Sequence, residues 1–145
     1  MKQETVSENA TAEVICELII QGTYFKENVF PSLNDLLSEA SRNPMSYGRL
    51  KKQMETIVIL EIRKQLKGWK ADKRVKLNIT WGEKAKGRRR DYDNIVSAGR
   101  KILNDGLVKA GVLKDDCPEY LGYGENFFEY VEKPFVKVQF VADTK

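Results

Sequence analysis

Apolar side chains recur along this chain with two different periods, and these periods predict the elements of its fold. Residues 73–82 alternate between apolar and polar side chains, which predicts a half-buried strand. Residues 45–67 place apolar side chains at helical spacing and are followed by Gly68, which predicts a long helix and its end. The same reasoning predicts strands at 12–21, 126–132 and 135–141, and helices at 32–42 and 94–110.

The predicted order is β-α-α-β-α-β-β, which favours an α+β fold. We expect a mixed or antiparallel sheet with the helices packed on one side. Residues 1–145 are expected to form a single domain, with residues 1–10 flexible. Residues 112–118 are expected to form a turn, and Lys133-Pro134 a tight connection between the last two strands.

Composition narrows the possible chemistry. The 145 residues are 41% hydrophobic and 32% charged, typical of a globular protein with a charged surface. The apolar stretch Val14 to Ile20 is far shorter than the roughly 20 residues of a membrane span, and the polar start resembles no secretory signal. We therefore expect a cytoplasmic protein without a membrane partner. The chain has no histidine, which excludes a histidine base or ligand, and its two cysteines are expected to be structurally passive.

Two aspartates mark the start of the most informative stretch, residues 88–116. Asp91 and Asp93 are two residues apart, so an extended segment would direct both carboxylates to the same side. Mg²⁺ suits such a pair, because it prefers oxygen ligands and needs one or two carboxylates besides water. Asp93 or Asn94 is also expected to cap the helix that follows. The alternative is a common helix cap with a solvated acid beside it.

A second acidic pair, Asp115 and Asp116, follows the helix that begins beside the first pair. A return of the chain after this helix is expected to bring the second pair near the first. Lys101 lies two helical turns after Asn94 and could reach a phosphate from the same helix face. Each feature alone is usually structural, since turns are rich in aspartate and helix lysines are usually solvated.

Three well-known motifs for binding metal or phosphate do not match this part of the chain. An EF-hand loop needs a glycine at its sixth position, and counting from Asp91 this position is Val96. A nucleophilic aspartate of the phosphatase type would follow an apolar strand, whereas arginines precede Asp91. The chain also contains no glycine-rich phosphate loop of the Walker type.

Five cations stand directly before these acids, in a chain whose net charge is only +4. Arginine forks bind phosphate in bidentate fashion, so this run predicts salt-dependent DNA binding that is largely blind to sequence. The alternative is an ordinary solvated loop. The expected DNA-contacting residues are Lys84, Lys86, Arg88, Arg89 and Arg90.

Residues 88–118 resemble the RusA family of Holliday junction resolvases. The likeness lies in Arg90-Asp91-Tyr92-Asp93-Asn94, in a helix that carries Lys101 and ends at Ala110-Gly111, and in Asp115-Asp116; Pro31-Ser32-Leu33-Asn34 is also similar to a segment of the family. The resemblance implies that Asp91, Asp93 and Asp116 bind metal, with Asp115 beside them. The family's lysine usually falls at the position of Ser97, and we expect Lys101, one turn further, to replace it.

By this resemblance we expect a homodimeric endodeoxyribonuclease of the phage or prophage type. It would use Mg²⁺, with Mn²⁺ as an alternative, to cut four-way junctions in DNA recombination and repair. Asp91, Asp93, Asp116 and Lys101 would be catalytic, and a twofold dimer would supply the paired nicks. The alternatives are a nuclease for other branched DNA, such as flaps or forks, a non-catalytic DNA-binding module, and a structural or partner-binding protein without salt-sensitive DNA affinity.

Overall fold

The computed structural model describes residues 13–143 of the chain. Its elements confirm the predicted class and order, and they add one short strand that the pattern did not predict. The expected flexibility of residues 1–10 lies outside the described residues. The elements are β1 (Val14–Gln21), α2 (Leu33–Arg42), α3 (Pro44–Leu66), β2 (Val75–Lys84), α4 (Tyr92–Lys109), β3 (Leu121–Gly122), β4 (Asn126–Val131) and β5 (Phe135–Ala142).

The sheet is mixed and has β2 and β5 at its centre. β5 pairs antiparallel with both β1 and β2, while β3 and β4 pair parallel with the other edge of β2. The connection between β4 and β5 is tight, as predicted, but the two strands do not form a hairpin, because β2 lies between them. Gly82 of β2 leaves room for Phe135, the first residue of β5, since a Cβ atom at Gly82 would overlap the Phe135 ring.

A buried arginine binds the segment that connects β3 and β4. Arg100 of α4 donates hydrogen bonds to the carbonyl oxygens of Leu77, Tyr123 and Glu125 at 3.0, 2.6 and 3.1 Å. Burial lowers the pKa of its guanidinium group from the ordinary value. Because four acceptors, including Asn126 Oδ1 at 3.1 Å, surround this buried cation, it fixes the loop before β4 to both α4 and β2.

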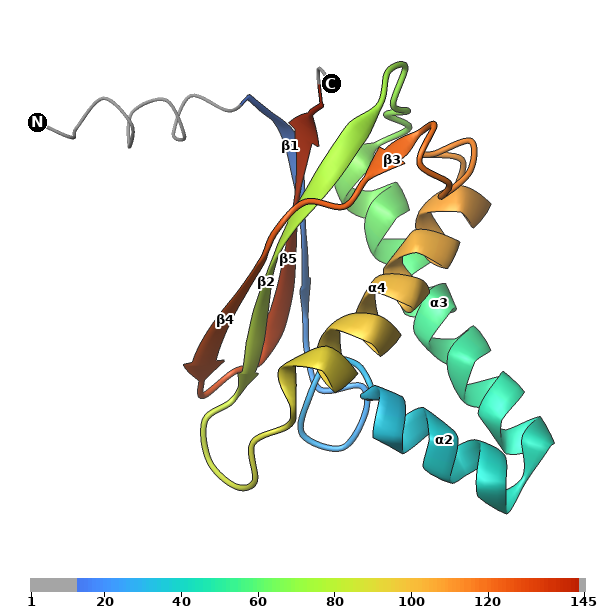
Figure 1. The fold of residues 1–145 in the computed structure, drawn as a ribbon, viewed down its shortest axis with the longest axis vertical. Helices are drawn as coiled ribbons and strands as arrows, with labels where there is room; N and C mark the ends of the chain where they lie inside the picture. The colour runs from blue at the N-terminus through green and yellow to red at the C-terminus, as the bar shows by residue number, and fades with distance from the viewer. Residues whose placement is uncertain (1–12, 144–145) are drawn as a thin grey trace, which may run out of the picture.

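The helices pack on one side of the sheet, as Figure 1 shows, and the core lies between the two layers. The predicted inward face of β2 is confirmed, because Val75, Leu77, Ile79 and Trp81 are all buried. Helix α4 approaches this face closely at Gly99, where a Cβ atom would overlap the Trp81 ring. Full burial of each large apolar side chain contributes about 1.5–3 kcal/mol, so this layer is the main source of stability.

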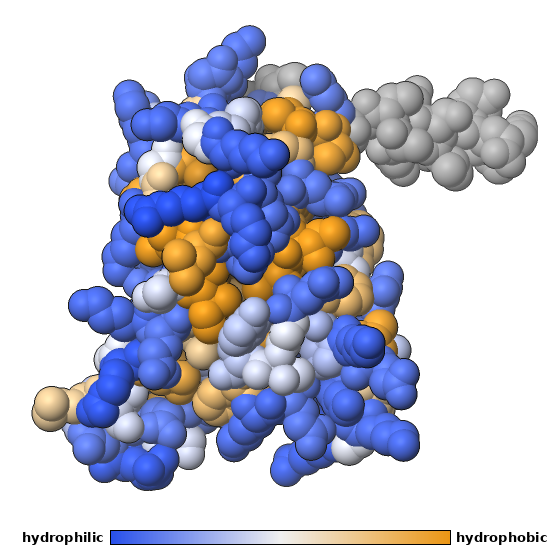
Figure 2. Space-filling model, turned by 180° about the vertical axis from the view of Figure 1, so that it is seen from behind, coloured by the Kyte–Doolittle hydropathy of each residue, from blue (hydrophilic) through white to orange (hydrophobic). Residues whose placement is uncertain are grey.

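Some apolar surface remains outside the core. The large apolar side chains of Val14 and Ile15 on β1 and of Leu60 on α3 are exposed. Figure 2 shows apolar surface gathered in the upper half of the rear face, crossed by polar side chains. Within residues 13–143, no helix has the length and apolar character needed to cross a bilayer.

Candidate active site

The two aspartates of the motif lie at the N-terminal end of α4. This helix begins at Tyr92, two residues earlier than predicted, because the Asp91 carbonyl accepts the first helical hydrogen bond from Ile95 N at 3.1 Å. Asp91 is therefore the N-cap residue, in place of the predicted Asp93 or Asn94. The expectation of one extended segment through Asp93 is wrong, since Asp93 lies in the first helical turn.

This position makes both carboxylates available to a ligand. Asp91 and Asp93 are exposed, and the Asp91 side chain does not bond to the helix backbone as a cap normally does. Asn94 Nδ2 approaches Asp91 Oδ2 at 3.4 Å. In the described part of the chain, the Asp93 carboxylate has no hydrogen bond or ion pair, while its backbone oxygen accepts from Ser97 Oγ at 2.6 Å. The positive end of the helix dipole partly offsets the two negative charges.

Arg90 differs from the other cations of the basic loop because its guanidinium group is already bound. It forms a bidentate pair with Glu83, at 2.8 and 2.7 Å, and donates to the Phe30 carbonyl at 2.9 Å. A second acid, Asp35, lies 3.4 Å away, and only 16% of the Arg90 side chain is exposed. Arg90 therefore ties the loop to β2 and to the start of α2, and so positions Asp91.

The remaining cations of the loop are more open. Lys86, Arg88 and Arg89 are exposed, and the Arg89 guanidinium lies 3.9 Å from the centre of the Tyr130 ring. Lys84 is half-buried, and its ammonium group donates to the Glu132 carbonyl at 3.3 Å. The turn of the loop occurs at Gly87, which has a φ of +91°. Of the five expected DNA-contacting residues, Lys86, Arg88 and Arg89 thus present the most accessible charge.

A cavity of about 610 Å³ connects this loop with the segment between β1 and α2. Lys26 and Asn28 were not identified from sequence, because no motif marks them and they lie about 60 residues before the arginines. Their segment is held in place by Asn28 Oδ1, which accepts from Lys84 N at 3.0 Å. The lining residues are Phe25, Lys26, Asn28, Ser32, Asn34, Asp35, Arg88, Arg89, Arg90, Asp91 and Asn94.

Lys101 lies near the middle of α4, and the second acidic pair follows the C-terminal end of this helix. Lys101 Nζ lies 3.2 Å from Asp105 Oδ1. The hydrogen bond and charge of Asp105 raise the pKa of this lysine, and the charge of Asp116 adds to the effect. Asp115 Oδ1 accepts from Asp116 N at 2.8 Å, which shapes the turn. The structure therefore places Asp116 on the side of Lys101.

The length of α4 keeps the two acidic pairs apart within one chain. Its 18 residues span about 27 Å at about 1.5 Å per residue. Figure 1 shows the loop before α4 and the loop after it at opposite ends of this helix. Within residues 13–143, no three acidic or cysteine side chains are grouped so that they could hold a metal ion. The expected grouping of Asp116 with Asp91 and Asp93 is therefore not seen within a single chain.

The chemistry of the first pair still fits a magnesium ion. Asp91 and Asp93 are exposed, and Mg²⁺ binds through one or two carboxylates while keeping several waters. Asp91 and Asn34 line the cavity, and the Asn34 amide offers a further oxygen ligand; Asp93 is not among the lining residues.

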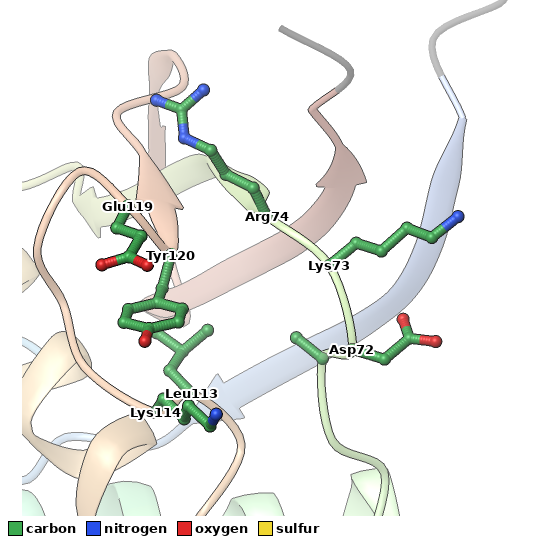
Figure 3. Close-up of a pocket in the computed structure, with 8 residues that line it drawn as sticks. Asp72, Lys73, Arg74, Leu113, Lys114, Glu119 and Tyr120 are labelled. Carbon is green, nitrogen blue, oxygen red and sulfur yellow. The ribbon is translucent and has the colours of Figure 1, made fainter.

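A second cavity, of about 400 Å³, lies beside the turn that carries Asp115 and Asp116 (Figure 3). Its cations are Lys73, Arg74 and Lys114, and its acids are Asp72 and Glu119. Arg74 is bound to Asp143 at 2.8 Å and to the Pro118 carbonyl at 2.8 Å. Because neither Asp115 nor Asp116 lines it, this cavity is a weaker candidate for the catalytic site.

Comparison of the chain with protein-family models and with curated proteins finds no match. The interpretation of the site accordingly depends on its residues and their geometry.

Proposed function

We propose that this protein is a Mg²⁺-dependent endodeoxyribonuclease that cuts branched DNA, with the Holliday junction as its main substrate. One observation carries the proposal: two exposed carboxylates, Asp91 and Asp93, stand at a helix N-terminus beside the exposed Arg88 and Arg89. Hydrolysis of a phosphodiester needs both parts, a site for a divalent cation and cations that hold the DNA backbone beside it.

Each part of the site has a role in this proposal. Asp91 and Asp93 hold the ion, for which Mn²⁺ is an alternative to Mg²⁺. The bound ion would supply Lewis-acid chemistry, which lowers the pKa of a water molecule and polarises a phosphate oxygen. Lys86, Arg88 and Arg89 bind phosphates, Lys84 adds charge at the end of β2, and Lys26 adds charge across the cavity. Arg90 keeps the loop in place. Action on DNA in the cytoplasm, in recombination and repair, is part of the proposal.

Asp116 and Lys101 enter the site through a second copy of the chain. Asp93, Ser97 and Lys101 follow one another at four-residue spacing and form an exposed stripe on α4. A twofold axis beside Ser97 would pair Asp93 of one copy with the oppositely charged Lys101 of the other. The same operation would bring the Asp116 end of one α4 toward the Asp91 end of its partner. Each dimer would then contain two composite sites, one for each nick.

The experiment is Mg²⁺-dependent cleavage of a synthetic four-way junction, with flap and fork substrates in parallel. We expect Asp93→Asn to keep junction binding and to lose cleavage by more than about 100-fold, because it removes a direct metal ligand. Asp72→Asn is the control, since this exposed acid lines the other cavity. Unchanged cleavage by Asp93→Asn would refute the proposed metal site. Faster cutting of flaps or forks than of the four-way junction would show that these, and not the junction, are the main substrate.

The second candidate function is a non-catalytic DNA-binding module. It is favoured by the separation of Asp116 from Asp91 and Asp93 in the single chain, since a module needs no third carboxylate. This candidate predicts salt-sensitive junction binding by the unaltered protein without cleavage in either Mg²⁺ or Mn²⁺.

A further inference from the structure

An aromatic side chain stands between the two candidate metal ligands. Tyr92 is 56% exposed, although it is the first residue of a helix that packs on the core. Its ring is stacked on Phe128 of β4, with 4.3 Å between the ring centres and an angle of 22° between their planes. Since Phe128 covers one face of the ring, the exposed surface of Tyr92 is mainly the opposite face.

Strand β4 supports Tyr92 and Arg89 in the same manner. Phe128 and Tyr130 are two residues apart, so they lie on the same face of the strand, about 7 Å from each other. Arg89 lies over the ring of Tyr130 as Tyr92 lies over that of Phe128. The Arg89 guanidinium and the Tyr92 ring, which precede and follow Asp91 in sequence, are therefore both held against β4 at the edge of the sheet. Each turns one flat face outward.

We propose that Tyr92 is a stacking platform for an unpaired nucleobase of the bound DNA. This inference rests on the DNA-binding part of the proposed function and adds the class of nucleic acid that the site takes. A base has the flat, uncharged face that fits the open face of the ring. The phosphates on either side of that base would be attracted to Arg88 and Arg89, and repelled by Asp91 and Asp93 unless a cation lies between them.

Two physical arguments favour a base over an apolar side chain of a second copy. Tyr92 lies between Asp91 and Arg89 on one side and Asp93, at the end of the proposed dimer stripe, on the other; the centre of a protein interface is depleted in such charged residues. The ring is also fixed in advance by Phe128, so stacking on it would cost little side-chain entropy. A single-stranded segment or the unstacked centre of a junction offers such a base, and regular duplex does not.

The test measures binding of a short single strand that carries one 2-aminopurine, whose fluorescence falls when it stacks. Ca²⁺ replaces Mg²⁺, so that a cation still lies between the phosphates and the two aspartates, without the octahedral geometry that the proposed cleavage uses. The variants are Tyr92→Leu, which keeps apolar bulk over Phe128, and Tyr92→Trp, which keeps an aromatic face. Tyr123→Leu is the matched control, because Tyr123 is 64% exposed and its ring also lies against a planar group, the Arg100 guanidinium, at 4.2 Å.

We expect Tyr92→Leu to weaken single-strand binding about tenfold and to abolish the fluorescence change, with duplex binding unaltered. Tyr92→Trp and Tyr123→Leu should behave as the unaltered protein. The proposal is overturned if Tyr92→Leu binds the single strand normally, if Tyr123→Leu loses as much, or if Tyr92→Leu changes the oligomeric state instead. A protein that shows the Tyr92-dependent signal but never cleaves DNA would support this inference while refuting the nuclease.

Discussion

The three consecutive arginines before α4 occupy three different environments. Arg88 is exposed, Arg89 lies over the Tyr130 ring, and Arg90 is enclosed by Glu83, Asp35 and the Phe30 carbonyl. Sequence reasoning assigned the same role to all three, because the residues that distinguish them come from β2, β4 and the start of α2. Replacements within this run should consequently affect different properties of the protein.

Arg90→Gln should lower the free energy of unfolding by about 3 kcal/mol, because it leaves the buried Glu83 carboxylate without its partner. Arg88→Gln should leave stability unchanged within about 0.5 kcal/mol and weaken DNA binding instead. Urea unfolding measures the first effect. The salt dependence of DNA affinity measures the second, with a slope reduced by about one. Equal losses of stability in the two variants would contradict the distinction.

A second residue-scale prediction concerns the thiol of Cys16 on β1. Burial raises its pKa to about 11, because the thiolate is poorly solvated there. In a Cys117→Ser variant, alkylation by iodoacetamide should therefore be slow at pH 8. Its rate should rise about tenfold per pH unit until the pH approaches this pKa, since the thiolate is the reactive form. A rate that levels off near pH 9 would show that the half-buried Cys16 thiol is better solvated in solution than its place on β1 implies.

At the scale of single elements, periodicity predicted most of the fold. The alternation of β2 and the helical spacing of α3 are strong signals because both elements face one core, and the structure confirms them. The start of α4 was misplaced because Asp91, Asp93 and Asn94 are all good capping residues, and a sequence does not show which one leaves the helical conformation. β3 was missed because it has two residues and forms through pairing with β2, far away along the chain.

The close approach of α4 to β2 gives a prediction with an internal control. Gly99→Ala should lower the free energy of unfolding by about 1–3 kcal/mol, because its methyl group would overlap the buried Trp81 ring. Gly48→Ala lies in α3, where an added Cβ atom meets nothing within 4 Å. It should raise stability by about 0.5–1 kcal/mol, through the lower helix propensity of glycine. Thermal or urea unfolding measures both, and a destabilised Gly48→Ala with an unaffected Gly99→Ala would refute this packing.

At the scale of the whole molecule, the candidate site is divided between the two ends of α4. The sequence placed Asp91, Asp93 and Asp116 in one stretch, but spacing along a sequence does not give the direction in which a loop leaves a helix. The structure places Asp116 on the side of Lys101 and does not group it with Asp91 and Asp93 in one chain. This division leads to a prediction about two chains.

Mixing two inactive variants should restore cleavage if the sites are composite. Asp93→Asn and Asp116→Asn dimers, dissociated together and allowed to reassociate, form heterodimers in which one site carries both changes and the other carries neither. We expect about a quarter of the unaltered number of active sites, appearing as single nicks in the junction. If each site were built from one chain, every site would carry one of the two changes and no cleavage would return. Absence of any recovery would therefore refute the composite arrangement. Remixing each variant with itself is the control.

The position of β5 determines when this protein can complete its fold. β5 fills the gap between β1 and β2, so these two strands, more than 50 residues apart, have no common partner until residues 135–142 have left the ribosome. The edges of β1 and β2 that β5 later occupies therefore stay open while the preceding chain is synthesised. Open strand edges are sites of aggregation. A chain interrupted before residue 135 would contain every candidate catalytic residue and still lack the strand that joins β1 to the rest of the sheet.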